Sequence, residues 1–361
     1  MRVAIDIQTM LGQPTGFGFY VSNLVRALQK KSGSDLELVL IKPGNENDFS
    51  TPQRFIWDQF TFPRKAREQK IDLIHQPCFS VPLFYKGPVV VTIHDIISIL
   101  FPQTIKFASW IFYSKWRPFS YRKAKRIITI SESTKKDIIR VLNIPEEKIR
   151  VIPLSYDERY LSKINANGIN KIKKKYSLTD NYILHVGTLE PRKNLEFLID
   201  VFSQVIKIIN DQTLSLVIAG KKGWYYEGLF SLVKKLGLDK RIIFTGYISE
   251  QDKAAIYQGA KLFVFPSIYE GFGLPPLEAM ASGVPVISSN TSSMGEVVGE
   301  AGILISPYNK TKWIKELSRT LQDEKLMEEM KQKNLQQIKK FSWDKTAKAT
   351  IDVYKEAIND K

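Results

Sequence analysis

The 361-residue sequence has few of the residues that cross-link a chain or bind zinc. It contains one cysteine, Cys78, which excludes an internal disulfide, and three scattered histidines, which argue against a Cys/His zinc site. It also lacks a long apolar run. The best stretch, 89–101, is interrupted by His94 and Asp95, so no segment is long enough to span a bilayer. Because residues 1–7 are typical of an opening strand rather than a secretory signal, we expect a cytoplasmic protein.

Acidic residues are scarce relative to basic ones. The chain has 53 Lys and Arg against 37 Asp and Glu, for a net charge of +16, of which +13 falls in residues 1–180 and +3 in residues 181–361. Nucleic acid, anionic lipid or a phosphorylated substrate could each account for this charge. No RNP, KH or zinc-finger signature accompanies it, so we expect no nucleic-acid partner.

The order of the expected elements indicates two α/β domains. The chain exceeds the usual size of a single hydrophobic core. Short apolar runs alternate with helical stretches, which is the pattern of parallel sheets covered on both faces. Residues 156–180, rich in Lys, Asn, Ser and Asp, are expected to link the domains. The expected strands lie at 1–7, 36–41, 72–75, 89–94, 126–130, 148–153, 181–186, 214–219, 242–245, 262–265 and 285–288.

The most informative stretch is 267–287. Gly271 and Gly273 form a turn after an apolar run, and two prolines then suit the first turn of a helix, so Glu270 lies on the loop and Glu278 inside the helix. Such a turn presents main-chain N–H groups to an anion, whereas carboxylates accept hydrogen bonds from paired hydroxyls. The stretch therefore predicts a site for a phosphorylated sugar. The alternative is a loop that only turns, with Glu278 favoured by the helix dipole.

Two segments of the first half also place chemically useful groups at strand ends. Gly16 and Gly18 form a loop between the first strand and a helical pattern, which is either an anion-binding loop or only a turn. His94 and Asp95 follow a buried strand, where unpaired polar groups are costly, and this favours a functional role. The alternative is a pair that caps the next loop.

Two segments of the second half fit the same scheme, since parallel sheets bind ligands at the carboxyl ends of their strands. Arg192 and Lys193 fall at a loop-to-helix junction, where two cations could hold a diphosphate or could be ordinary surface charges. Gly246, Tyr247 and Ile248 follow another strand, and their main-chain groups could contact a nucleotide base.

Basic and aromatic residues are mixed in two stretches, 55–67 and 106–126. In the second, Trp110, Phe112 and Trp116 precede a dense Lys/Arg cluster, a composition typical of a helix at an anionic membrane surface. The alternative is that the aromatic rings face the core and the charges are solvated.

Taken together, these segments resemble the retaining glycosyltransferases of glycosyltransferase family 4, and the match covers nearly the whole chain. The resemblance implies an α/β GT-B fold, in which two Rossmann-like doubly wound parallel-sheet domains face each other across a cleft. The expected domains are an acceptor-binding domain at 1–170, a nucleotide-sugar-binding domain at 171–343 and a helix at 344–361 that packs back on the first. The matching elements are Gly16 with Gly18, 92–95, 130–133, 151–153, 187–194 and the Glu-x7-Glu pattern from Glu270 to Glu278.

The resemblance also implies roles for individual residues. Glu278 would accept hydrogen bonds from the ribose, Glu270 would accept them from the transferred sugar, and His94 would contact that sugar. Arg192 and Lys193 would neutralise the leaving diphosphate, so neither a metal nor another cofactor is expected. Further substrate-binding residues would be Gly16, Gly18, Asp95, Gly246, Tyr247, Ile248, Gly271, Phe272, Gly273 and Leu274.

The function implied is transfer of a hexose, preferably mannose, from a GDP- or UDP-sugar to a saccharide or lipid-linked saccharide. This reaction would serve cell-surface polysaccharide, lipopolysaccharide or glycolipid synthesis. The enzyme would be cytoplasmic or peripheral on the inner face of the cytoplasmic membrane, with 106–126 as its membrane surface. Two alternatives stay open, namely a GT-B-type nucleotide-sugar epimerase and a non-catalytic nucleotide-sugar-binding subunit.

Overall fold

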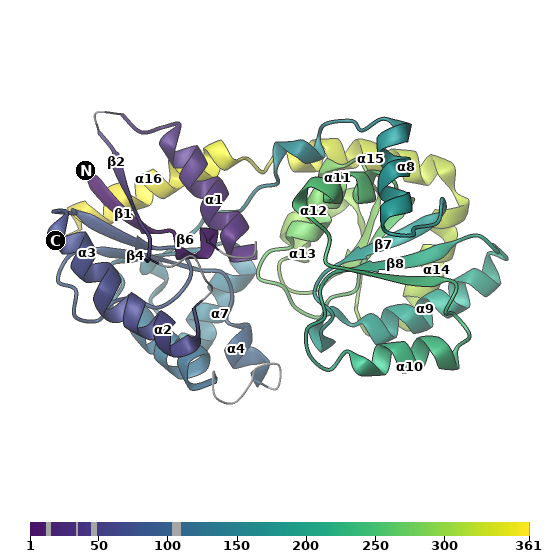
Figure 1. The fold of residues 1–361 in the computed structure, drawn as a ribbon, viewed down its shortest axis with the longest axis horizontal. Helices are drawn as coiled ribbons and strands as arrows, with labels where there is room; N and C mark the ends of the chain where they lie inside the picture. Colours follow the sequence, from purple (N-terminus) through teal and green to yellow (C-terminus); the bar gives the residue numbers. More distant parts are fainter. Residues whose placement is uncertain (12–15, 34, 45–48, 103–109, 361) are drawn as a thin grey trace. The chain divides into compact units, whose positions relative to one another are not determined.

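A computed structural model describes residues 1–11, 16–33, 35–44, 49–102 and 110–360, and the chain divides into two units (Figure 1). Unit 1 comprises Met1–Ser155 and Ser342–Lys361, and unit 2 comprises Tyr156–Phe341. Each unit contains a six-stranded sheet, and all strand pairs within the two sheets are parallel. The two doubly wound parallel sheets expected from the sequence are therefore confirmed.

The sheet of unit 1 has the order β2-β1-β3-β4-β5-β6. Its strands are apolar runs rich in Val and Ile, and β4 is buried along its whole length. The strands are β1 (Arg2–Asp6), β2 (Glu37–Ile41), β3 (Leu73–Gln76), β4 (Val89–Ile93), β5 (Arg126–Thr129) and β6 (Ile149–Val151). The order changes direction between β1 and β3, which makes the loops after these two strands the switch point where ligands bind in such sheets.

Helices and turns of unit 1 connect these strands. They are η1 (Gln8–Met10), α1 (Gly16–Gln29), α2 (Thr51–Ile56), the π-helical turn η2 (Trp57–Thr61), α3 (Phe62–Glu68), α4 (Ile97–Leu100), the π-helical turn η4 (Phe112–Trp116), α6 (Arg117–Tyr121), α7 (Glu132–Leu142), η5 (Glu146–Lys148) and α16 (Trp343–Asn359). The last helix, α16, packs against α1. It is fastened to the sheet by a 2.7 Å hydrogen bond between the Tyr354 hydroxyl and His75 Nδ1.

The sheet of unit 2 has the order β12-β11-β10-β7-β8-β9, so its switch point lies between the adjacent strands β7 and β10. The strands are β7 (Tyr182–Val186), β8 (Ser215–Ala219), β9 (Ile242–Gly246), β10 (Leu262–Phe265), β11 (Val286–Ser289) and β12 (Ile303–Ile305). The helices and turns are η6 (Glu158–Tyr160), α8 (Ala166–Lys175), η7 (Pro191–Lys193), α9 (Leu195–Ile208), α10 (Glu227–Lys235), α11 (Glu250–Gln258), α12 (Leu274–Ala281), α13 (Met294–Val297), η8 (Gly299–Ala301), α14 (Lys310–Gln322) and α15 (Glu324–Ile338).

The core of unit 2 lies between its sheet and the paired helices α9 and α14. Leu198 and Phe202 recur at helical spacing on α9, and Trp313 and Leu317 do so on α14; all four are fully buried in one cluster with the sheet. Complete burial of each such side chain contributes about 1.5–3 kcal/mol. The sheet that carries the switch-point loops is thus a rigid support.

Residues 156–180 differ from the expected interdomain linker. Asn165 caps α8 by accepting a 2.9 Å hydrogen bond from the Gly168 N–H, and α8 packs on α11. The Tyr160 ring packs edge-on against Tyr257, with 5.7 Å between centroids. Because the segment folds onto unit 2, the division falls between Ser155 and Tyr156 instead of after residue 170.

Three smaller features also differ from expectation. Gly16 and Gly18 lie in the first turn of α1, not in a loop, because the helix already begins at Gly16. The second division falls between Phe341 and Ser342 instead of after residue 343, since Ser342 already caps α16. The short strand β12 was not expected, because three residues are too few to show a strand pattern.

Candidate active site

The switch point of unit 2 brings two loops together. One follows β7 and contains η7, and the other follows β10 and leads to α12. The loops are joined by a 2.9 Å hydrogen bond from the Ile268 N–H to the Arg192 carbonyl. Their positions place Arg192, Lys193 and Glu270 in contact, although 77 residues separate Lys193 from Glu270.

Glu270 is bound on both oxygens. Lys193 Nζ lies 2.6 Å from Oε1 and Arg192 Nη1 lies 2.8 Å from Oε2, while the Ser267 hydroxyl donates to Oε1 at 2.5 Å. Burial opposes ionisation of this carboxyl group, but the two cations outweigh it and lower its pKa to about 2. Burial and the nearby guanidinium together lower the pKa of Lys193. The cluster is thus an ionised group of preformed pairs.

Both cations are held by further contacts. Arg192 Nη2 is paired with Glu190, and Arg192 Nη1 donates to the Tyr269 carbonyl at 2.5 Å. The Lys193 ammonium lies 5.1 Å from the centroid of the Phe265 ring, a cation–π contact. Sequence reasoning missed Glu190, although a carboxylate two residues before an arginine at a loop could have indicated it.

Glu278 lies on α12 and is only 3% exposed. The Tyr257 hydroxyl donates to Oε2 at 2.8 Å, and Lys253 Nζ lies 3.4 Å from Oε1. Burial raises the pKa of this carboxyl group, against the opposing effect of Lys253. Tyr160 is buried beside it, and burial together with the Glu278 carboxylate raises the pKa of the Tyr160 hydroxyl. Sequence reasoning missed these three neighbours, although Lys253 and Tyr257 share one face of α11 at i, i+4 spacing.

The loop before α12 is fixed by two serines. The Glu270 N–H donates to Ser292 Oγ at 2.9 Å, and Ser293 Oγ donates to the Glu270 carbonyl at 3.1 Å and to the Phe272 carbonyl. Gly273 is the N-cap residue of α12 with φ of 121°, a conformation that favours glycine. Gly271, Phe272 and Gly273 are buried, and Leu274 begins the helix.

Gly246 ends β9, which is two strands away from β7, and Tyr247 and Ile248 follow it at the same edge of the sheet. Tyr247 is 51% exposed, whereas the Ile248 side chain is buried. For Ile248 only main-chain groups are therefore free to meet a ligand at this edge.

In unit 1, His94 follows β4 and is buried between the rings of Phe17 and Tyr20. Its Nε2 lies 2.9 Å from the Pro77 carbonyl, so Nε2 carries the proton and Nδ1 is an acceptor. Burial lowers the pKa of His94 to about 4, which keeps the ring neutral at physiological pH. Asp95 accepts a 3.0 Å hydrogen bond from the Ile97 N–H at the start of α4, so it does cap the next segment.

A second buried charge cluster lies at the carboxyl end of β1, where Asp6 meets residues of α2 and η2. Arg54 Nη1 lies 3.0 Å from Asp6 Oδ2 and 3.2 Å from Asp58 Oδ1. Asp58 Oδ2 also accepts hydrogen bonds from the Ser80 N–H at 3.0 Å and the Ser80 hydroxyl at 2.7 Å. Burial raises the pKa of Asp58 to about 6, despite the opposing effect of Arg54. No spacing rule connects Asp6 with Arg54, so the sequence did not predict this cluster.

In the described part of the chain, no three or more His, Cys, Asp and Glu side chains are grouped so that they could hold a metal ion. Likewise, none of the described helices combines the length and the apolar character needed to cross a membrane.

Two family models match the sequence. "Glycosyl transferases group 1" matches residues 168–337, and "Glycosyltransferase Family 4" matches residues 14–159. O-antigen chain mannosyltransferase B of Escherichia coli is 33% identical over 304 residues, which are 84% of this chain and 77% of that protein. The serotype-specific mannosyltransferase WbdA of Escherichia coli is 35% identical over 235 residues, but these are only 29% of that protein and 64% of this chain.

Two solved structures have the same fold. Anabaena Alr3699/HepE in complex with UDP and glucose gives a TM-score of 0.75 at 17% identity, covering 98% of this chain and 99% of that one. WaaG, a glycosyltransferase involved in lipopolysaccharide biosynthesis, gives a TM-score of 0.73 at 14% identity, covering 99% of this chain and 100% of that one. The expected GT-B fold with two Rossmann-like domains is thereby confirmed, while their placement across a cleft stays a prediction. On the family models and the E. coli relative together, the chain belongs to glycosyltransferase family 4.

Proposed function

We propose that this glycosyltransferase moves a hexose, preferably mannose, from a nucleotide diphosphate sugar to a saccharide or lipid-linked saccharide in cell-surface polysaccharide synthesis. The observation that carries the proposal is the placement of Arg192, Lys193 and Glu270 at the switch point of unit 2. The printed activities of the E. coli relatives support mannose, and the UDP complex of HepE supports a nucleotide-sugar donor.

The two cations suit the charge that develops in such a transfer. As the bond between the anomeric carbon and the diphosphate oxygen breaks, positive charge grows on the sugar and negative charge on the leaving diphosphate. Arg192 and Lys193 would stabilise that negative charge, in the role that a divalent ion has elsewhere, so we propose a metal-independent reaction. The acceptor hydroxyl would attack from the face of the leaving group and give its proton to the departing phosphate, with retention of configuration.

The carboxylates would recognise hydroxyls. The diphosphate would replace part of the contact between Glu270 and the two cations, and Glu270 would then accept a hydrogen bond from the sugar. Glu278 would accept hydrogen bonds from the ribose. Main-chain amides from 271 to 274 would hold the sugar and its phosphate, and 246–248 would contact the base. His94 Nδ1 would accept a hydrogen bond from the sugar, since its Nε2 proton is used on Pro77.

A thermal-shift screen of UDP, GDP, ADP, CMP and their sugar conjugates tests the proposal. A ligand at about 100 times its dissociation constant adds roughly 2.7 kcal/mol of stability. We expect one diphosphate family to stabilise the wild type, unchanged by EDTA, and to lose this effect in Glu278→Ala. Glu196→Ala, an exposed carboxylate on α9, is the matched control.

The products separate the alternatives. Release of the nucleotide with a glycosylated acceptor supports transfer. An altered nucleotide sugar without acceptor product would instead support the epimerase, and nucleotide binding without any product would support the binding subunit.

We also propose a membrane surface on unit 1, which differs in extent from the expected 106–126. Residues 106–109 lie outside the described residues, and Arg126 is paired with Glu356 of α16 at 3.2 Å. The stretch 55–67 joins the surface instead, because the Phe55 ring contacts Trp116 with 5.0 Å between centroids.

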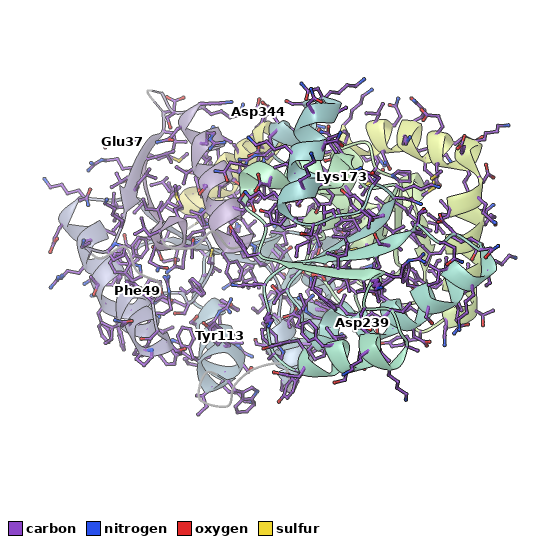
Figure 2. All side chains as sticks on the ribbon, turned by 45° about the vertical axis from the view of Figure 1, so that its right-hand side comes forward. Glu37, Phe49, Tyr113, Lys173, Asp239 and Asp344 are labelled. Carbon is purple, nitrogen blue, oxygen red and sulfur yellow. The ribbon has the colours of Figure 1, made fainter. Side chains whose placement is uncertain are left out.

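Exposed rings and cations make up this surface. Phe60, Phe84 and Phe119 are 53%, 70% and 60% exposed, and Phe60 stacks on Phe84 with 6.5 Å between centroids. Lys115 and Lys123 are exposed cations of the same region. Other rings do face inward, as Phe112 does. The ring of Tyr113, labelled in Figure 2, also contacts the Arg117 guanidinium, which lies 5.4 Å from the ring centroid.

Sedimentation with anionic vesicles tests the membrane surface. We expect binding to weaken with salt and to be lost when Phe60 and Phe84 are replaced by Ser or Lys115 and Lys123 by Gln. Equal binding by both double variants would remove the proposal.

A further inference from the structure

The loop that follows β8, residues 220–226, exposes two consecutive aromatic side chains. Trp224 is 39% exposed and Tyr225 is 72% exposed. The loop leaves the carboxyl end of a strand that is paired with β7, so it lies at the sheet edge that carries the charge cluster. Large apolar rings exposed together beside a site indicate a contact surface for a ligand.

This loop is fastened to the loop that bears the active-site cations. The Leu189 N–H donates to the Lys221 carbonyl at 3.0 Å, and the Gly223 N–H donates to the Leu189 carbonyl at 3.1 Å. A Cβ at position 223 would lie 2.6 Å from the Leu189 carbonyl oxygen, so only glycine permits this approach. Leu189 directly precedes Glu190, the partner of Arg192. The exposed rings and the cations therefore lie on two loops that main-chain hydrogen bonds hold together.

The two rings that follow hold the base of the loop. The Lys222 ammonium lies 5.3 Å from the centroid of Tyr226 and 5.4 Å from that of Phe230, so these contacts are made within the protein. Tyr225 has φ of 55°, a left-handed conformation that costs a non-glycine residue about 1–2 kcal/mol. The loop thus keeps a strained backbone while its Tyr225 side chain stays largely in solvent.

The chemistry of these side chains fits a sugar ring. A pyranose has an apolar face of C–H groups and an edge of hydroxyls, and Trp and Tyr combine a flat apolar face with one polar atom. Both also lose little conformational entropy on binding, since each has only two side-chain torsions. A glycosyltransferase has to bind a saccharide acceptor as well as its donor. The residues of unit 2 discussed above are all proposed to bind the donor, so none of them is assigned to the acceptor.

We propose that Trp224 and Tyr225 form a saccharide subsite of unit 2, which binds a sugar unit of the acceptor other than the one that receives the hexose. The inference rests on the proposed function. It makes the donor domain contribute to acceptor choice, and it favours acceptors of two or more sugar units over a single sugar.

Transfer kinetics with α-linked mannosides of one, two and three units test the subsite. In Trp224→Ala and Tyr225→Ala, we expect KM for mannotriose to rise about tenfold, which corresponds to ~1.4 kcal/mol, while KM for methyl α-mannoside is unchanged. Hydrolysis of the donor without acceptor, the KM for the donor and the thermal midpoint are expected to match the wild type. Ile208→Ala, which removes a 59% exposed apolar side chain at the far end of α9, is the control and should change none of these values.

Three results would overturn the subsite. One is the same KM change for all acceptor lengths, and a second is unchanged kinetics for every acceptor. The third is a weaker affinity for the nucleotide, which would place the rings against the donor base. If the wild type transfers to none of these mannosides, the proposed function fails for mannose, and saturation-transfer NMR with mannotriose still decides. Mannotriose signals that persist in Trp224→Ala, or that are missing in the wild type, would refute a saccharide subsite.

Discussion

The two sheets carry a buried charge cluster at the same topological position, but the two clusters differ in their balance. In unit 1 one guanidinium, Arg54, serves two carboxylates, whereas in unit 2 two cations and two carboxylates are paired. The pKa of Asp58 is accordingly raised to about 6, and that of Glu270 is lowered to about 2. The number of cations, and not burial alone, decides which carboxyl group stays ionised.

The difference also separates a structural cluster from a chemical one. Asp58 accepts hydrogen bonds from the protein on both oxygens, and the Arg54 guanidinium lies 4.1 Å from the centroid of Phe79 and 5.2 Å from that of Phe49 (labelled in Figure 2). The charged groups of that cluster are therefore bonded to other groups of the protein. In unit 2 the cations are held mainly by carboxylates, which a diphosphate can partly replace.

Replacing one arginine in each cluster should give the largest effects, and the two replacements should affect different properties. Arg54→Met leaves two buried carboxylates without a cation, so we expect a loss of about 3–5 kcal/mol of stability, seen as a lower unfolding midpoint. Arg192→Met should leave Lys193 paired with Glu270 and change the midpoint less. It should instead lower the transfer rate about 10²–10³-fold. The opposite pattern would show that the roles of the clusters are exchanged.

The pH dependence of stability should have opposite signs in the two units. The Asp58 pKa is raised from 3.8 to about 6, so the folded state binds more protons in that window and stability falls as the pH rises through it. The Glu270 pKa is lowered from 4.5 to about 2, so its contribution is complete above 4.5 and is lost as the pH falls through that range. Each effect is at most about 3 kcal/mol.

Urea unfolding midpoints of Asp58→Asn and Glu270→Gln, relative to the wild type, measure these two contributions. The difference in urea midpoint between Asp58→Asn and the wild type should change between pH 4 and 6. The difference in urea midpoint between Glu270→Gln and the wild type should change below pH 4.5. Parallel pH curves for all three proteins would contradict both assignments.

A smaller effect is expected where one contact of the unit 2 cluster is removed. Glu190→Gln takes away one partner of Arg192 and leaves the other, so we expect the transfer rate to fall about tenfold, or ~1.4 kcal/mol, with weaker nucleotide affinity. The unfolding midpoint should hardly change, and Glu196→Gln should behave like the wild type. A lower midpoint with normal kinetics would make Glu190 a purely structural residue.

The smallest expected effect concerns His94. Because burial lowers its pKa to about 4, it should not ionise between pH 5 and 8. The pH profiles of kcat/KM for the wild type and His94→Gln should then be parallel in this range, even if their heights differ. A break near pH 6 that disappears in His94→Gln would contradict a neutral acceptor.

Local patterns were enough to place much of the fold and part of the site. Proline and glycine positions marked α12, so the loop position of Glu270 and the helical position of Glu278 were predicted correctly. The loop-to-helix position of Arg192 and Lys193 was also correct. Their roles stay predictions.

Contacts between distant segments could not be predicted in this way. Asp6 and Arg54 are 48 residues apart, and Tyr257 meets Glu278 only because α11 packs on α12. Residues 156–180 misled for a related reason. Their polar composition is that of a linker, whereas α8 is held by its cap and by packing on α11.

The chain passes between the units twice, at Ser155 and at Phe341, and this has a consequence for synthesis. When the first 155 residues leave the ribosome, His75 still lacks Tyr354 and α1 still lacks α16. Unit 2 is complete once residue 341 has been synthesised. It can therefore finish folding before unit 1, whose synthesis began first. A stop codon at Ser342 would therefore damage the half of the protein made earliest and leave the later half complete.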